Sequence, residues 1–159
     1  MALRRRGGVS LYLDTSTIVP LFVAEDYSNE IAAWLEAAEQ VLIVADLAVA
    51  EFNAVVSRLV RSRAIDQASA DSIRSQFAEW RDAAAESLEN LPADIREAGR
   101  LVCTPRPKLL TADATHLATC KRLRITLVTL DADLQAIAER EGVPWAHPSR
   151  VPQSLKSPP

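Results

Sequence analysis

The chain has 159 residues, of which 48% are hydrophobic and 25% are charged, and its formal net charge at pH 7 is -3. These proportions are typical of one folded globular domain and exclude a disordered or fibrous chain. A chain of this length buries a hydrophobic core without help from disulfides or a structural metal, so any metal is expected to serve function. The negative net charge gives no global argument for nucleic-acid binding, which has to be sought in local features.

Short apolar runs alternate with longer helical patterns along the chain. The runs Val9 to Leu13, Val41 to Val44 and Ile125 to Leu130 predict buried strands, and Asp14 and Asp131 directly follow the first and the last. Weaker strand signals lie near Leu88 to Leu91 and Val143 to Ala146, and helices are predicted at about 16 to 24, 28 to 39, 47 to 63, 67 to 87, 93 to 103, 112 to 123 and 132 to 141. This alternation predicts an α/β fold with a central, mostly parallel sheet covered by helices on both faces.

The two ends of the chain carry different signals. Arg4-Arg5-Arg6 precedes an apolar run that is too short for a secretory signal or a membrane span, so we expect no membrane association and a cytoplasmic protein. From residue 148 onward the chain is rich in proline and poor in apolar residues. We therefore predict one domain over residues 1–147 and a flexible tail over residues 148–159.

The cysteines and histidines do not indicate a zinc or redox site. Cys103 and Cys120 lack the close spacing of such sites, and both are expected to pack as small apolar residues. Only two histidines, His116 and His147, are present. His116 is expected to be a partly exposed helical residue and not a metal ligand.

Acidic residues follow two of the predicted strands. In open α/β sheets, ligands bind at the carboxyl ends of the strands, which is where Asp14 and Asp131 lie. Each of these residues, taken alone, has a simpler interpretation as the N-cap of the next helix.

Two further acids lie on predicted helices. Glu51 has Leu47 and Val55 four residues to either side, which places it on the apolar face, where an ionised carboxylate is costly without a partner. The alternative is a buried ion pair, for example with Arg58. Asp113 begins another helix, where the helix dipole alone would favour a negative charge.

Taken together, the four acids suggest a metal site at one sheet edge. Clustered carboxylates repel one another unless cations bind, and oxygen ligands suit Mg²⁺ or Mn²⁺. Two such ions would activate a water and stabilise the leaving oxygen in phosphodiester hydrolysis. No Ser, His or Cys nucleophile is then required.

Four short motifs carry a family resemblance that runs from Leu11 to about Trp145. They are Leu13-Asp14-Thr15-Ser16, Ala50-Glu51-Phe52, Thr111-Ala112-Asp113-Ala114 and Thr129-Leu130-Asp131. In this order and spacing the chain resembles the PIN-domain ribonucleases, and more narrowly the VapC-type toxins of toxin–antitoxin pairs. The resemblance implies a PIN-like three-layer fold and a metal-dependent endoribonuclease that uses Mg²⁺ or Mn²⁺.

The resemblance also implies roles for individual residues. The catalytic, metal-binding acids would be Asp14, Glu51, Asp113 and Asp131. Asp133 is either a fifth acid or a residue that only starts the last helix. Ser16 and Thr129 match hydroxyl positions that would orient a water or a carboxylate, although ordinary capping explains them equally well. Asp46 departs from the usual Ser or Thr and is predicted to be an N-cap.

Partners follow from the resemblance as well. It implies an RNA substrate, a homodimer and a cognate VapB-like antitoxin. Ile31, Trp34 and Leu35 form an apolar stripe that would either receive such a partner or, more simply, pack in the core. Two basic groups would either steer phosphates or be solvated charge: Arg58, Arg61 and Arg63, and Lys121, Arg122 and Arg124.

Two other functions compete with the nuclease. A phosphatase with Asp14 as covalent nucleophile would need a second acid two residues later, where this chain has Ser16. A PIN-like binding module without catalysis would not require all four acids to be present.

Overall fold

The computed structural model describes residues 10–25, 27–104 and 106–148. Five strands form one sheet: β1 (Leu11–Leu13), β2 (Leu42–Ala45), β3 (Ala85–Leu88), β4 (Thr126–Val128) and β5 (Trp145–Ala146). Their order is β3-β2-β1-β4-β5, and all four strand pairs are parallel. The predicted α/β fold with a parallel central sheet is therefore confirmed. The arginines at positions 4 to 6 and the tail from residue 149 lie outside the described residues.

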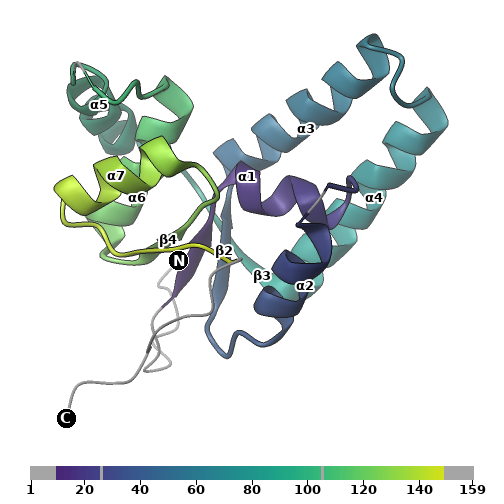
Figure 1. Ribbon diagram of the computed structural model, residues 1–159, viewed down its shortest axis with the longest axis horizontal. Coiled ribbons are helices and arrows are strands. Elements are labelled where there is room, and N and C mark those ends of the chain that lie inside the picture. The colour runs from purple at the N-terminus through teal and green to yellow at the C-terminus, as the bar shows by residue number, and fades with distance from the viewer. Residues whose placement is uncertain (1–9, 26, 105, 149–159) are drawn as a thin grey trace.

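Helices cover both faces of this sheet (Figure 1). One face carries α1 (Thr15–Ile18), the 3-10 turn η1 (Val19–Leu21), α2 (Ser28–Glu36), α3 (Asp46–Arg61) and α4 (Gln67–Ala84). The other face carries α5 (Pro92–Leu101), α6 (Thr111–Leu123) and α7 (Ala132–Arg140). The result is a three-layer molecule with a separate hydrophobic core on each side of the sheet.

The central strand β1 shows how the sequence builds these two cores. Its three residues are all fully buried, and side chains in a strand point alternately to opposite faces. Leu11 and Leu13 pack in the core beneath α3 and α4, whereas Tyr12 packs in the core beneath α6 and α7. A strand buried on both faces explains why the sequence shows a continuous apolar run with no polar alternation.

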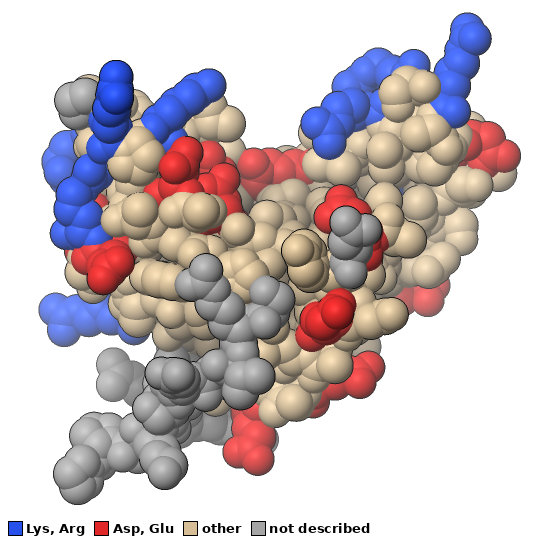
Figure 2. All heavy atoms as spheres, viewed as in Figure 1, with Lys and Arg blue, Asp and Glu red and all other residues tan. Residues whose placement is uncertain are grey.

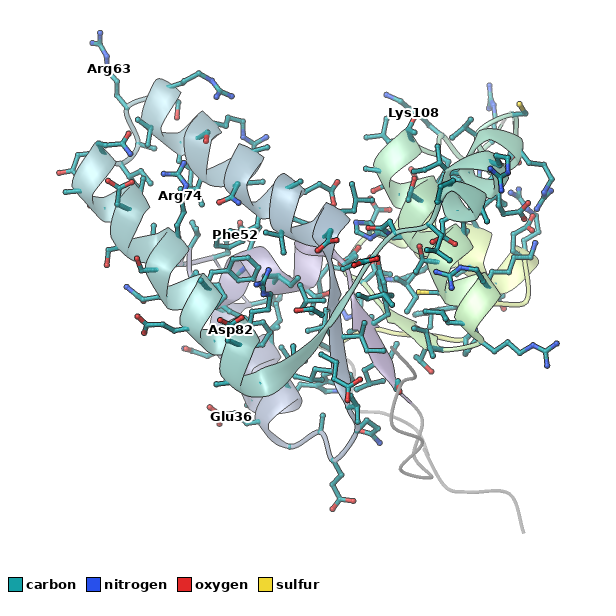
Figure 3. All side chains as sticks on the ribbon, turned by 180° about the vertical axis from the view of Figure 1, so that it is seen from behind. Glu36, Phe52, Arg63, Arg74, Asp82 and Lys108 are labelled. Atoms are coloured by element: carbon teal, nitrogen blue, oxygen red, sulfur yellow. The ribbon has the colours of Figure 1, made fainter. Side chains whose placement is uncertain are left out.

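Helices α3 and α4 form a long antiparallel hairpin that extends beyond the sheet (Figures 1 and 3). Four rings hold this hairpin to the domain: Phe22, Phe52, Phe77 and Trp80. Phe52 stacks on Phe77 with ring centroids 4.1 Å apart. Nearer the tip, Arg74 of α4 donates a 2.9 Å hydrogen bond to Ser57 of α3. The hairpin is therefore fixed at its base by aromatic packing and along its length by polar contacts.

Some element boundaries differ from the prediction. The helix expected at 16 to 24 is split into α1 and η1, because Pro20 has no backbone N–H to continue the α-helix. The helix expected to reach residue 87 ends at Ala84, and the strand expected at 88 to 91 begins at Ala85. Pairing of Ala85 to Leu88 with β2 outweighs the helix propensity of the alanine run. Gly142, with φ of 69°, ends the last helix as predicted.

Two predictions about single apolar positions have different outcomes. Ile31 and Leu35 are buried in the core beneath α2, so core packing is the main use of that stripe. Cys120 is buried, but Cys103 is exposed, and its thiol donates to the carbonyl of Gly99. The prediction for Cys103 was wrong because the residue follows the last turn of α5 on the solvent side.

The strand order places a crossing point at the centre of the sheet. The chain moves outward from β1 through β2 to β3, and then returns to add β4 on the opposite side of β1. In sheets of this kind the crevice at the carboxyl ends of the two diverging strands is the usual ligand site. Within the described residues, no helix has the combination of length and apolar composition needed to cross a membrane.

Candidate active site

The carboxyl ends of β1 and β4 bring Asp14 and Thr129 side by side. Leu13 pairs with Val128 in the parallel register, so the residues that follow them are neighbours at the strand ends. Thr129 Oγ1 donates a 2.6 Å hydrogen bond to Asp14 Oδ2. The same hydroxyl accepts a 3.0 Å hydrogen bond from the backbone N–H of Asp131. One hydroxyl therefore links the two acids that follow the strands.

The other oxygen of Asp14, Oδ1, accepts three hydrogen bonds. Ser16 Oγ donates to Asp14 Oδ1 at 2.6 Å, and the Thr17 backbone and hydroxyl donate to the same oxygen at 3.2 and 3.1 Å. Ser16 Oγ accepts a hydrogen bond from the backbone N–H of Leu130, which ties the turn after β4 to the start of α1. Both roles expected for Ser16, carboxylate orientation and local turn bonding, are therefore present in one geometry.

Asp14 is held as a nearly buried carboxylate, with 4% of its surface exposed. Burial raises the pKa of Asp14 above its ordinary value, while His116 and the three hydroxyl donors act in the opposite direction. Asp14 is the N-cap of α1, as its simpler interpretation predicted. A cap uses one side-chain hydrogen bond, however, and the hydroxyl donors from Ser16 and Thr129 go beyond what capping requires.

Glu51 reaches the same strand ends from α3. Its Oε2 accepts a 2.6 Å hydrogen bond from the Thr15 hydroxyl and lies 2.7 Å from His116 Nε2. Burial raises the pKa of Glu51, but the hydrogen bond and charge of His116 and the Thr15 hydroxyl outweigh burial, so the pKa lies below its ordinary value. Among the described residues its partners are Thr15 and His116, and the alternative of an ion pair with Arg58 is not what the structure contains.

Asp113 and Asp131 complete the acidic group. Burial and the nearby charge of Asp131 raise the pKa of Asp113 to about 6, and the charges of Glu51 and Asp14 act in the same direction. Asp131 caps α7 through a 2.8 Å hydrogen bond from the backbone N–H of Leu134. The charges of the other three acids therefore act on Asp113, and they help to raise its pKa.

The structure corrects two predictions for nearby residues. His116 is not partly exposed: it is 1% exposed and bonded through both ring nitrogens, because its position on α6 points it toward the sheet. Asp46 does not cap α3, since the helix already begins at that residue and Ala45 occupies the N-cap position. The first turn of α3 instead receives a side-chain acceptor from another element, because Leu47 N–H donates to Asn90 Oδ1 at 3.0 Å.

Asp133 lies exposed in the first turn of α7, where the helix dipole favours a negative charge. Its role as a fifth acid stays a prediction.

The donor chemistry of this site fits a hard divalent cation. The side chains that converge on it offer carboxylate and hydroxyl oxygens, and mutual repulsion raises the pKa of Asp113. Within the described residues no three His, Cys, Asp or Glu side chains are close enough to form a ready-made metal cage. Mg²⁺ does not need such a cage, because it commonly keeps several waters and takes only one or two carboxylates from the protein.

Basic side chains flank the acidic centre on both sides (Figure 2). On the hairpin, Arg58 and Arg61 lie in the last turn of α3, and Arg63 projects from the tip. Lys108 projects from the opposite lobe (Figure 3). A notch with acidic side chains separates the two basic groups in the space-filling view.

Lys121 and Arg122, two of the three residues in the second basic group, have a structural role instead. Arg122 makes two hydrogen bonds, of 2.6 and 2.8 Å, to the buried carboxylate of Asp94. Lys121 bonds to Glu97 and Glu141. These cations hold α5, α6 and the end of α7 together, which leaves the hairpin arginines as the better candidates for contact with phosphates.

The family model described as PIN domain matches residues 11–140, a range that contains all four acids and both hydroxyls. The chain belongs to the PIN domain family. No curated protein sequence matches it.

Several solved structures share this fold at low sequence identity. FitAcB from Neisseria gonorrhoeae is 16% identical, with a TM-score of 0.71 over 89% of this chain and 99% of that chain. VapC20 of Mycobacterium tuberculosis, described as a sarcin–ricin loop cleaving toxin, is 18% identical, with a TM-score of 0.64 over 80% and 94%. VapBC2 from Rickettsia felis, bound to a DNA fragment from its promoter, is 13% identical, with a TM-score of 0.63 over 86% and 97%.

These likenesses establish the fold, and they cover nearly all of each neighbour. The sequence motifs had placed Asp14, Glu51, Asp113 and Asp131 in one site. Sequence reasoning missed Thr15, Tyr12 and Asn90, which hold Glu51 and His116. Thr15 lies inside the first motif, so its proximity to Asp14 was a usable signal. Nothing in the sequence marked Tyr12, because it is part of an apolar strand.

Proposed function

We propose that this PIN-domain protein is a metal-dependent endoribonuclease, with Asp14, Glu51, Asp113 and Asp131 as its catalytic, metal-binding acids. The observation that carries the proposal is the convergence of acids at the ends of β1 and β4, where the Thr129 hydroxyl joins Asp14 to the backbone of Asp131 and Glu51 arrives from α3 through Thr15. Burial and the charges of the other three acids raise the pKa of Asp113 to about 6 in the same surroundings. Carboxylates gathered at the cost of mutual repulsion are expected where a cation compensates them. Mg²⁺ or Mn²⁺ is the cofactor that such oxygen ligands favour.

Each part of the chain has a defined task in this proposal. When bound, the cation supplies activation of water and stabilisation of the charge on the leaving oxygen. Ser16, Thr17 and Thr129 hold both oxygens of Asp14 in fixed directions, and Thr15 and His116 hold Glu51. The acids thus need little rearrangement when a cation arrives, which is the value of a preorganised site.

RNA is the substrate that the surroundings favour. The hairpin arginines and Lys108 flank the acidic notch, and cations beside an anionic centre offer phosphate contacts along a bound strand. VapC20, a neighbour in fold, is described as cleaving the sarcin–ricin loop. The resemblance to VapC-type toxins adds a VapB-like antitoxin and a homodimer as partners.

The test is cleavage of RNA by the purified protein freed of any antitoxin. With Mn²⁺ or Mg²⁺ present, wild type should cut RNA and Asp113→Asn should not, and a chelator should stop the wild-type reaction. Sequencing of RNA ends after brief induction would identify the cut sites. Absence of cleavage by folded wild type in both metals would support the inactive binding module instead.

The phosphatase alternative has less support. A phosphatase with Asp14 as nucleophile would need a second acid two residues later, where this chain has Ser16, whose hydroxyl donates to Asp14 Oδ1. A phosphorylated Asp14 recovered after incubation with a phosphate monoester would reverse this preference. A short reading frame for an antitoxin beside the gene, and co-purification of its product, would test the toxin assignment.

A further inference from the structure

His116 is a buried histidine in contact with one of the proposed metal-binding acids. It lies on α6 three residues after Asp113 and is 1% exposed. Its Nε2 is 2.7 Å from Glu51 Oε2, and its Nδ1 is 2.7 Å from the hydroxyl of Tyr12. Both ring nitrogens therefore have partners on other elements, Glu51 on α3 and Tyr12 on β1. A ring held at both ends has one orientation.

The hydrogen bond between His116 and Glu51 has a defined direction. Carboxylate oxygens only accept hydrogen bonds, and Glu51 Oε2 already accepts one from the Thr15 hydroxyl. In the 2.7 Å contact with His116, Nε2 is therefore the donor. Both donors to Glu51, from Thr15 and from His116, go to Oε2. Oε1 is thus the oxygen left for a cation.

A second layer of contacts connects the two helices that carry Glu51 and His116. Asn90, in the connection between β3 and α5, accepts from Leu47 N–H in the first turn of α3 and donates to Thr119 on α6 at 3.2 Å. Asn90 therefore fastens the helix that carries Glu51 to the helix that carries His116.

We propose that His116, held by Tyr12, is a positioning residue that fixes the carboxylate of Glu51 for cation binding. The inference rests on the proposed metal-dependent function and names how one of its ligands is oriented. Hydrogen bonds from a second layer of residues commonly fix the direction of metal-binding carboxylates, and their loss lowers metal affinity. The burial of His116 makes it a poor candidate for direct contact with RNA.

The experiment compares two amide substitutions at one position. His116→Gln places an amide N–H near the location of Nε2, whereas His116→Asn is too short to reach Glu51. Mn²⁺ affinity is measured on the free protein by electron paramagnetic resonance, with no RNA present. We expect His116→Asn to raise the dissociation constant by about 10- to 100-fold, and His116→Gln to restore most of the affinity. Tyr12→Phe should raise it by a smaller factor.

Two results would contradict the positioning role of His116. Wild-type affinity in folded His116→Asn would overturn the positioning role, as would equal losses in the Asn and Gln variants. Should His116→Asn fail to fold, as judged by its melting curve, Tyr12→Phe and His116→Gln carry the comparison, and full wild-type affinity in Tyr12→Phe would count against the role of Tyr12.

A second measurement separates this inference from the proposed function. Long-range ¹H–¹⁵N correlation spectra of the metal-free protein report whether His116 Nε2 bears a proton. A protonated Nε2 supports the contact with Glu51, and an unprotonated Nε2 overturns it, regardless of any metal. If wild type binds no Mn²⁺ at all, the metal-dependent function fails, while the spectra still decide whether His116 holds Glu51.

Discussion

Thr129 donates a 2.6 Å hydrogen bond to Asp14, although the two residues are 115 positions apart in the chain. The parallel register of β1 and β4 makes them neighbours, and the same hydroxyl accepts the backbone N–H of Asp131. Two acids of the site are therefore oriented by one oxygen atom. This arrangement ties the position of the acids to the pairing of the central strand β1 with its neighbour β4, both of which are buried.

Replacement of Thr129 by valine tests this link. Valine keeps the shape but leaves the Asp131 N–H without its acceptor and Asp14 without one donor, which should cost about 1 to 3 kcal/mol of unfolding free energy. Loss of carboxylate orientation should lower RNA cleavage by roughly 10- to 100-fold. Thr129→Ser, which keeps the hydroxyl, is the matched control for both the melting and cleavage assays. Equal effects of valine and serine would contradict the role of the hydroxyl.

Asp14→Asn should abolish RNA cleavage and weaken Mn²⁺ binding without loss of the fold. Burial raises the pKa of Asp14, so its charge is held at a cost and its removal relieves repulsion within the acidic group. The asparagine oxygen can still accept from Ser16 and Thr17. We expect the melting temperature to stay within about 2 to 4 °C of wild type, equivalent to about 1 kcal/mol. A sharp fall would indicate that Asp14 serves mainly as a structural cap.

The fold was predictable from the sequence because its periodicities are strong. Continuous apolar runs before Asp14 and Asp131 indicated strands buried on both faces, and the long patterns between them indicated helices. The failures occurred where long-range pairing decides the local structure. The alanine run at 83 to 85 favours a helix by propensity alone, and only the partner strand β2 draws Ala85 into the sheet.

Only part of the candidate site was predictable from the sequence. Strand ends identified Asp14 and Asp131, and apolar spacing drew attention to Glu51. The surroundings of His116 were not predictable, because exposure of a helical residue depends on which face the sheet covers. Asn90 was equally hidden: it lies in a connection, and its contact with the first turn of α3 spans 43 positions. Sequence patterns thus identified the acids, whereas the residues that orient them required the fold.

The raised pKa of Asp113 makes stability depend on pH in a defined direction. Its ordinary value of 3.8 rises to about 6 in the folded protein, so between these values the folded state binds more protons than the unfolded state. Stability from this group therefore falls as pH rises from about 4 to 6, and above pH 6 the charge remains a net cost.

Asp113→Asn removes that cost. At pH 7.5 and without metal, the variant should melt about 2 to 4 °C above wild type, equivalent to about 1 kcal/mol after allowance for the partial exposure of Asp113. The difference should vanish near pH 3.5, where Asp113 is protonated in both states. Mn²⁺ should raise the melting temperature of wild type more than that of the variant. A variant that melts below wild type at pH 7.5 would mean that the Asp113 carboxylate stabilises the metal-free fold.

The arginines of the hairpin should contribute to RNA binding through charge alone. Arg58 and Arg61 lie in the last turn of α3 and Arg63 projects from the tip of the hairpin, on a separate element from Asp113 and Asp131. Their combined replacement by alanine should leave Mn²⁺ affinity unchanged and weaken RNA binding, measured with an Asp14→Asn background to prevent cleavage. For single-stranded RNA, the slope of log affinity against log salt concentration should become shallower by about 0.7 for each phosphate that the protein no longer neutralises.

Arg74→Ala is the control, because this arginine lies on the same hairpin but is engaged by Ser57 and Asp71. An unchanged salt dependence in the triple variant, or an equal change in the control, would place the RNA path elsewhere on the molecule, with Lys108 of the opposite lobe as the next residue to replace.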